Sequence, residues 1–243
     1  MRSNFTLLGP VHIAILSAIP ACAASLAWLA RQFPPAERWI RLALAVFLLL
    51  NACLWYGYLA WRHWLSFPGT LPLDLCDATL CLTIVALFTR SSAVFDLAYY
   101  GALAGTSMAL LTPDLWEPFP SFSTVDFFVT HGMVQVAVLY LIGARQARPR
   151  PGSVWRAMLA LNVFAVAVGA FDWIFATNYM YLRAKPGNPS LLDFLGPWPW
   201  YILSSEGIAL ALFILLYLPF STKRPRRRPP GSSSNSRASL SGL

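Results

Sequence analysis

The sequence predicts an all-α, polytopic membrane protein, and three observations carry this prediction. First, 57% of the 243 residues are hydrophobic and only 12% are charged, about half the charged share of a soluble domain. Second, the apolar residues form long runs, and a helix needs about 20 of them to cross the bilayer. Third, the alternating ten-residue strands of a membrane barrel are absent, so helices are the structures that can satisfy the backbone in hydrocarbon.

Seven apolar runs are candidate spans and together occupy most of the chain. They cover residues 10–30, 41–61, 71–89, 93–112, 125–143, 156–176 and 198–219. We therefore expect one seven-helix domain over residues 1–220, with no room for a separate soluble domain. Residues 221–243 are rich in Pro, Ser and Arg without apolar periodicity, which predicts a disordered basic tail.

The first run has an alternative interpretation as a secretory signal. Its "SAIPACAAS" segment contains the small residues that precede a cleavage site, and it could also pass for a weak lipoprotein box ending at Cys22. Cleavage would place residues 31–41, which contain three arginines, outside the cell. The positive-inside rule opposes this arrangement, so we interpret the run as a retained span.

Basic residues set the expected orientation. If the tail is cytoplasmic, seven spans put the N-terminus outside, and fourteen of the 18 Lys and Arg residues then lie inside. This bias favours N-out and C-in in a cell membrane. The net charge of +8 therefore indicates topology and contact with anionic lipids, and no nucleic-acid partner is expected.

Polar residues within the spans gather near the outer side. Ionisable groups inside a membrane are costly and default to functional hypotheses. In the expected orientation, Asp74, Cys76 and Asp77 lie in the outer third of the third span, and His131 lies at a similar depth in the fifth. Asp172 and Glu206 lie in the outer halves of the last two spans, with Asn162 as an exception further in. We expect a shared cavity that opens toward the outer leaflet.

A thiol and an imidazole on neighbouring helices suit acyl transfer from an ester. The histidine takes the thiol proton, the sulfur attacks the carbonyl, and the imidazolium protonates the leaving oxygen. At this depth the accessible esters are those of membrane phospholipids. Cys76 and His131 are thus the candidate catalytic residues. The sequence contains no metal-type His/Cys spacing and no phosphate-binding loop, so no metal or cofactor is expected.

Several residues are candidates for supporting roles, each with a plainer alternative. Asp172 or Glu206 could orient His131, or pair with Arg183, and Asn178 or backbone N–H groups could hold an oxyanion. Asp74 and Asp77 could simply cap their helix, and the aromatic residues could form an interfacial belt. The supporting or substrate-binding candidates are Asp77, Asp172, Asn178, Tyr179, Trp198, Trp200, Tyr201 and Glu206.

Four segments carry a family resemblance. "LPLDLCD" (71–77), "TPDLW" (112–116), "FFVTHG" (127–132) and the long "TNYMYLRAKPGNPSLLDFLGPWPWY" (177–201) resemble the YwaF family of bacterial integral membrane proteins. That family is related to eukaryotic transmembrane protein 164, and more distantly to the androgen-induced lipid hydrolases, which use a threonine and a histidine. The resemblance implies a phospholipid acyltransferase in which Cys76 is the nucleophile and His131 its partner.

Other function classes stay open. Buried carboxylates and a histidine also suit a proton-coupled or small-solute transporter, although transport needs polar groups that reach both faces and the inner half is nearly bare. A non-catalytic membrane protein is the plainest alternative. A retinal-binding protein is disfavoured because the last span contains no lysine for a Schiff base.

Overall fold

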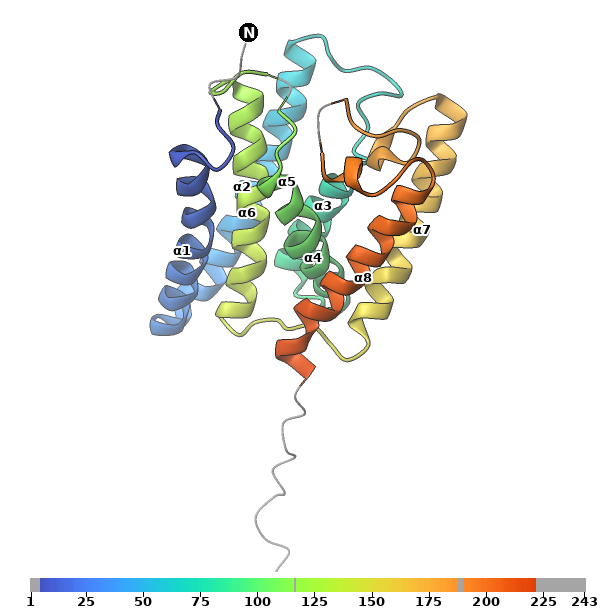
Figure 1. The fold of residues 1–243 in the computed structure, drawn as a ribbon. Coiled ribbons are helices and arrows are strands. Elements are labelled where there is room, and N and C mark those ends of the chain that lie inside the picture. The colour runs from blue at the N-terminus through green and yellow to red at the C-terminus, as the bar shows by residue number, and fades with distance from the viewer. Residues whose placement is uncertain (1–4, 116, 188–189, 222–243) are drawn as a thin grey trace, which may run out of the picture.

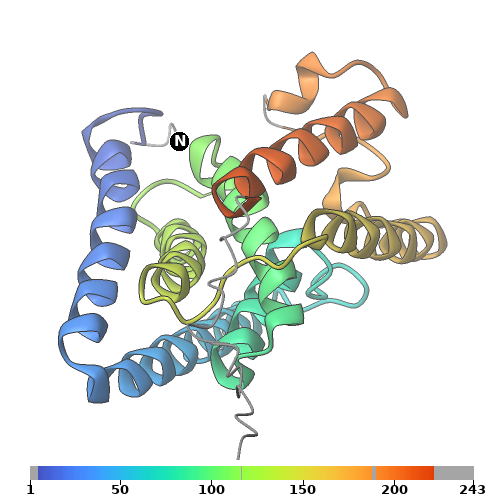
Figure 2. The ribbon, with the colours of Figure 1, turned by 90° about the horizontal axis from the view of Figure 1, so that it is seen from below.

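The computed structural model describes residues 5–115, 117–187 and 190–221, and the predicted disordered tail lies outside this range. Helices run along nearly the whole described chain, which contains no β-strand. Figure 1 shows them as a bundle, and the view from below in Figure 2 shows that several of its helices are strongly tilted against one another. The expectation of an all-α fold is confirmed.

Within the described residues six helices are long and apolar enough to cross a membrane, and with the apolar composition they make the chain a multi-pass membrane protein. The elements are α1 (Pro10–Gln32), α2 (Pro34–Trp61), α3 (Leu75–Thr89), α4 (Ser92–Tyr100), η1 (Gly101–Thr106), α5 (Ser107–Leu111), α6 (Phe122–Gly143), α7 (Ser153–Phe175), η2 (Tyr179–Tyr181), η3 (Leu191–Phe194) and α8 (Trp200–Ser221). α4, η1 and α5 form one continuous span, so seven apolar segments are present as expected.

The bundle is organised around α6. This helix contacts α1, α2, α3, η1 and α5, and half of its span is buried. α7 and α8 pair with each other at one side of the bundle (Figure 2) and bury little of their surface. We call the end of the bundle where α1, α6 and α8 begin the upper end, as it is drawn in Figure 1.

α3 is shorter than the span expected at residues 71–89. It begins at Leu75 and has 15 residues, which at about 1.5 Å per residue is about 22 Å, less than the ~30 Å hydrocarbon core. The preceding residues 71–74 are not helical, and Pro72 lacks the N–H that a helix interior would need. The chain descends from the end of α2 before α3 starts (Figure 1), so the first turn of α3 lies within the bundle.

A π-helical turn lies beside this first turn. η1 interrupts the α4–α5 helix at Gly101–Thr106, and such turns concentrate at functional sites. A side chain at Gly101 would clash with Thr79 of α3, and one at Gly105 would contact Leu75. Glycine is therefore what lets α3 approach η1 closely.

At the lower end, basic residues expected to set topology also hold the fold together. The buried Asp96 carboxylate accepts from Arg150 Nε at 2.8 Å and from Arg156 Nη2 at 3.0 Å. Arg41 on α2 is buried and donates to the carbonyl of Leu87 on α3. Arg41 and Arg156 thus connect helices, and Arg150 connects the loop before α7 to α4, in addition to any role in orientation.

Candidate functional site

The loop that follows α7 covers the start of α3. We define this covering loop as residues 176–187, all of them described. Tyr179 is its anchor, because its hydroxyl donates to the carbonyl of Pro68 at 2.7 Å and accepts from the N–H of Leu71 at 2.8 Å. Asn178 holds the loop in shape, because its Oδ1 accepts from the N–H groups of Arg183 and Ala184. The amide of Asn178 is thus engaged in the loop itself, unlike the oxyanion contact that the sequence suggested.

The covering loop contains strained backbone directly above α3. Met180 and Tyr181 have φ angles of 53° and 55°, in the left-handed region that costs non-glycine residues roughly 1–2 kcal/mol each. The N–H of Met180 donates to Asp74 Oδ1 at 2.9 Å. Such strain persists where the surroundings over-determine it, commonly at binding and catalytic sites.

Three carboxylates lie around this junction. Asp74 is the N-cap residue of α3, but its side chain bonds the covering loop instead of capping its own helix. Asp77 lies in the first turn of α3. Asp172 is fully buried and its Oδ1 accepts from Thr177 Oγ1 and from the N–H of Tyr179. Asp172 therefore fixes the turn from α7 into the covering loop.

Burial and these neighbours shift the pKa of Asp74, which precedes α3, and of Tyr181, which lies in the covering loop. Burial raises the pKa of Asp74, the N–H of Met180 opposes that shift, and the nearby Asp172 adds to it. Burial also raises the pKa of Tyr181, with the Asp114 carboxylate and, more weakly, Asp74 and Cys76 acting in the same direction. Tyr181, which donates to Asp114 at 3.2 Å, is therefore an electrostatic neighbour of Cys76.

Cys76 lies on the core-facing side of α3. Leu80, Thr83 and Leu87 follow it at helical spacing on the same face, and all three are buried. Cys76 is half-buried at the upper end of this face, whereas Cys81, on the far side of the helix, is exposed. The thiol of Cys76 is thus directed toward the interior of the bundle.

His131 of α6 is half-buried and is held in one tautomer. Its Nδ1 lies 2.7 Å from the carbonyl of Phe127. A carbonyl can only accept, so Nδ1 carries the proton and Nε2 keeps a lone pair in the neutral ring. Among the described residues Nε2 has no hydrogen-bond partner. The expected orienting carboxylate is replaced here by this backbone carbonyl and by the Phe127 ring, whose centroid lies 4.1 Å away.

The η1–α5 segment connects the surroundings of these two residues. Leu75, next to Cys76, packs against Gly105 of η1. Gln135, one turn below His131, donates to Ser107 Oγ of α5 at 2.8 Å. Gly105 and Ser107 are two residues apart, so the first turn of α3 and the His131 face of α6 border the same stretch of this helix.

The remaining sequence candidates lie apart from this centre. Glu206 of α8 accepts from Asn162 Nδ2 of α7 at 3.0 Å. Glu206 is expected in the outer half of its span and Asn162 deeper in the membrane, yet the two side chains are paired. Tyr201 is buried and donates to the carbonyl of Tyr181. Trp198 donates from Nε1 to the carbonyl of Leu182 and is mostly exposed, as is Trp200. Tyr201 and Trp198 thus support the covering loop, and the two tryptophans face the surroundings.

Sequence reasoning missed a polar cluster between α2 and α6. Asn51 Nδ2 donates to Asp126 Oδ1 at 2.9 Å and to Thr130 Oγ1 at 2.6 Å. Asp126 follows Ser123 and Thr124 near the start of the span, where a polar residue draws little notice. A carboxylate four residues before a threonine on a helix was the available signal, since such a pair shares one face.

No group of His, Cys, Asp or Glu side chains that could hold a metal ion occurs within the described residues. Two of the carboxylates near Cys76, those of Asp74 and Asp172, accept from backbone N–H groups of the covering loop. The chemistry that this arrangement can perform with its own groups is proton transfer by the Nε2 lone pair of His131 and nucleophilic attack by the Cys76 sulfur.

Comparisons with known proteins identify the family. Searches of the curated proteins and of the solved structures gave no match. The model of the TMEM164 family matches residues 7–217, a range that contains six of the apolar segments, most of α8, the covering loop, Cys76 and His131. The chain belongs to the TMEM164 family.

Proposed function

We propose that this protein is a membrane enzyme that transfers or hydrolyses the acyl chain of a glycerophospholipid, with Cys76 as nucleophile and His131 as general base. The observation that carries the proposal is the tautomer of His131, whose basic Nε2 is left available on a face of α6 that borders η1–α5, as the first turn of α3 does. The resemblance of the Cys76 and His131 segments to an acyltransferase family supports the same assignment.

The reaction would proceed through a thioester. His131 Nε2 takes the proton of the Cys76 thiol while the sulfur attacks the ester carbonyl. The tetrahedral intermediate breaks its C–O bond, and the imidazolium returns the proton to the departing lysophospholipid oxygen. A second lysophospholipid, or water, then loses its proton to His131 and attacks the thioester. This step releases the acylated product and restores the thiol.

The surroundings of Cys76 favour a neutral thiol at rest. Asp74 and Asp77 flank it, and a water-poor interior with nearby negative charge disfavours a thiolate. Proton removal is therefore coupled to attack, which makes His131 essential. The N–H groups in the first turn of α3 have no acceptor within the helix, and they are the donors best situated to hold the oxyanion.

The orientation that supports this reaction is N-out and C-in in the cell membrane. The upper end of the bundle would then face outward, and the substrate esters would be those of the outer leaflet. The charge distribution along the loops supports this orientation.

Substitution of Cys76 tests the proposal. Purified protein in liposomes that contain a phospholipid labelled on one acyl chain should release or transfer the label. Cys76→Ala should remove this turnover, and Cys76→Ser should lower it by about 10²-fold or more because the hydroxyl is a poorer nucleophile. Cys81→Ala, five residues away on the exposed face, is the matched control and should keep full activity. Full activity in Cys76→Ala would refute the proposal.

A further inference from the structure

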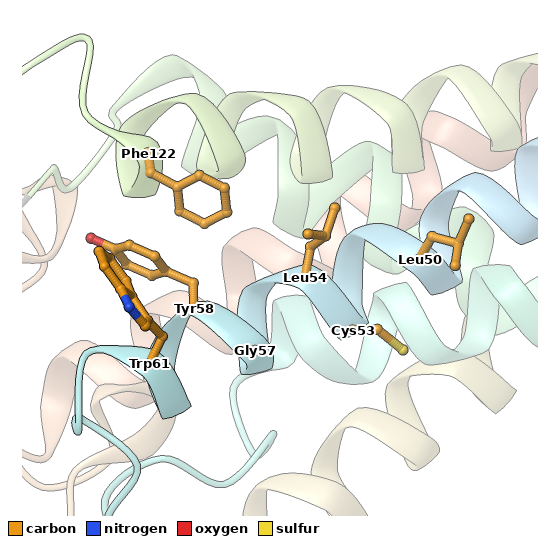
Figure 3. A pocket seen from close by; sticks show the side chains of 7 residues that line it. All are labelled: Leu50, Cys53, Leu54, Gly57, Tyr58, Trp61 and Phe122. Atoms are coloured by element: carbon orange, nitrogen blue, oxygen red, sulfur yellow. The ribbon is translucent and has the colours of Figure 1, made fainter.

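An apolar groove runs along the outside of α2, away from the Cys76–His131 region. Figure 3 shows its lining, in which Phe122 from the start of α6 faces Tyr58 while the other residues follow α2. The groove has a volume of about 590 Å³, within the roughly 300–1,000 Å³ of typical ligand sites. Its lining includes Leu50, Leu54, Gly57, Tyr58, Trp61 and Phe122.

The length of the groove matches one leaflet of a bilayer. Leu50 and Trp61, its two ends, are eleven residues apart, or about 16 Å at about 1.5 Å per residue. Half of the ~30 Å hydrocarbon core is about 15 Å. The groove begins near the end of α2 at the upper end of the bundle and follows the helix back to Leu50. An acyl chain of the upper leaflet would fit along it.

Gly57 keeps the floor of the groove open. A Cβ built on Gly57 would meet no atom within 4 Å, so neither clash nor close packing requires glycine there. Glycine in a helix interior costs roughly 0.5–1 kcal/mol relative to alanine. A large side chain at this position would therefore extend into the open space of the groove.

The head end of the groove presents a cation among aromatic rings. Arg62, the residue after α2, donates to Tyr58 Oη at 3.1 Å, and its guanidinium lies 4.1 Å from the centre of the Trp64 ring. The one ion pair of Arg62 within the described residues is with Glu117 at 3.9 Å, and 38% of the Arg62 side chain stays exposed. A guanidinium at the interface with free N–H donors matches a phosphate group.

The two walls of the groove are held in fixed positions. The Asn51–Asp126–Thr130 cluster joins α2 to α6 one turn below Phe122, and the Tyr58 and Phe122 rings are in tilted contact, with centroids 4.4 Å apart. The groove is thus a preformed feature.

We propose that the groove is a binding site for one glycerophospholipid, with an acyl chain along Leu50–Trp61 and the phosphate at Arg62. The site holds its lipid in the same leaflet as the covering loop. It does not depend on the Cys76–His131 reaction, since its lining contains neither residue and it requires only apolar contact and one charge pair.

Photo-crosslinking tests this site in the full chain. The probe is phosphatidylglycerol with a diazirine on one acyl chain, and the protein carries Cys76→Ala so that the probe cannot be turned over. Peptide mass spectrometry should find the cross-links concentrated on residues 50–61 and on Phe122. Labelling spread evenly over the lipid-facing residues of α7, such as Val163 and Val166, would show ordinary annular lipid and overturn the proposal.

Matched variants separate the groove from the general surface. Gly57→Leu should lower labelling of residues 50–61 about tenfold because it fills the floor, whereas Gly57→Ala should keep it. Gly207→Leu on α8, where a Cβ also meets nothing within 4 Å, should change nothing. Leu54→Trp gives a second block on an exposed side chain if Gly57→Leu fails to fold. Equal labelling in the blocked variants and in Gly207→Leu would refute the site.

A comparison of two probes, one with and one without a phosphate, tests the role of the phosphate. A diacylglycerol with the same diazirine lacks the phosphate and should label residues 50–61 about tenfold less than phosphatidylglycerol. Arg62→Gln should remove this difference by lowering only the phospholipid signal. Equal labelling by the two probes in the unsubstituted groove would contradict a phospholipid site.

Discussion

Two histidines near the upper end of the bundle have opposite surroundings. His12 of α1 is fully buried, and both ring nitrogens are bonded: Nδ1 accepts from the N–H of Leu8, and Nε2 lies 2.7 Å from the carbonyl of Leu110. His131 of α6 is half-buried, and only Nδ1 has a partner, the carbonyl of Phe127. Both ring nitrogens of His12 are thus used in hydrogen bonds within the fold, whereas His131 keeps one basic nitrogen without a partner among the described residues.

The carbonyl groups that bond His12 and His131 also differ in whether they would keep a hydrogen bond if the histidine were removed. Leu110 lies in the last turn of α5, which ends at Leu111, so its carbonyl has no acceptor role within the helix and depends on His12. Phe127 lies inside α6, where its carbonyl already accepts the helical bond from residue 131. The fold therefore needs His12 more than it needs His131, which is the pattern expected when one histidine is structural and the other catalytic.

The largest expected effect is on turnover. His131→Gln keeps a side chain of similar size but removes the base, so turnover of phospholipid esters should fall by about 10²–10⁴-fold. The melting temperature should hardly change, because the carbonyl of Phe127 keeps its helical bond. Thermal unfolding in detergent and the labelled-phospholipid assay measure the two quantities. Normal turnover in a well-folded His131→Gln variant would contradict the catalytic role of His131 and thus its contrast with His12.

The next effect is on stability. His12→Ala leaves the carbonyl of Leu110 without its partner and removes the contact with the Phe5 ring, whose centroid lies 5.1 Å away. Such a loss costs about 1–3 kcal/mol, which should appear as a lower melting temperature. Turnover per folded molecule should remain near that of the unsubstituted protein. A loss of turnover without a loss of stability would mean that His12, too, is part of the reaction.

The smallest expected effect is at the covering loop and depends on pH. Because the folded-state pKa of Asp74 is raised from its ordinary 3.8, its contribution to stability is full at low pH and is lost as pH rises through the raised pKa. Asp74→Asn keeps an oxygen for the N–H of Met180 and removes the charge. Its melting temperature relative to the unsubstituted protein should therefore increase as pH rises above about 4, and Asp74→Leu should be less stable than Asp74→Asn. A constant difference between Asp74→Asn and the unsubstituted protein across pH would exclude the buried charge as the cause.

Much of the fold follows from hydropathy, because an apolar run in a chain of this composition has few alternatives to a helix. The ends were less predictable. α2 begins at Pro34, earlier than the expected residue 41, since prolines are tolerated in a first turn. α3 begins later than expected because residues 71–74 are not helical. Leu71 and Leu73 are apolar, and hydropathy does not distinguish an apolar helix from an apolar segment without helical structure.

The sequence was enough to select the residues of the candidate site, but it did not predict which residues they contact. Cys76, His131 and the carboxylates stand out because polar groups in apolar runs are costly. Their partners do not, since the bonds from Asp172 to Tyr179 and from Asp74 to Met180 join segments up to 106 residues apart. The tautomer of His131 depends on a contact with its own helix, which four-residue spacing permits but does not require.

The most direct test of the account is to look for the acyl group on the protein. Brief incubation with phospholipid, acid quenching and peptide mass spectrometry should find a thioester-linked acyl chain on Cys76. The adduct should be released by hydroxylamine, should be absent in Cys76→Ala and should form far more slowly in His131→Gln. A protein that turns over phospholipid and carries its acyl group on another residue, or on none, would contradict the assignment of Cys76 and His131.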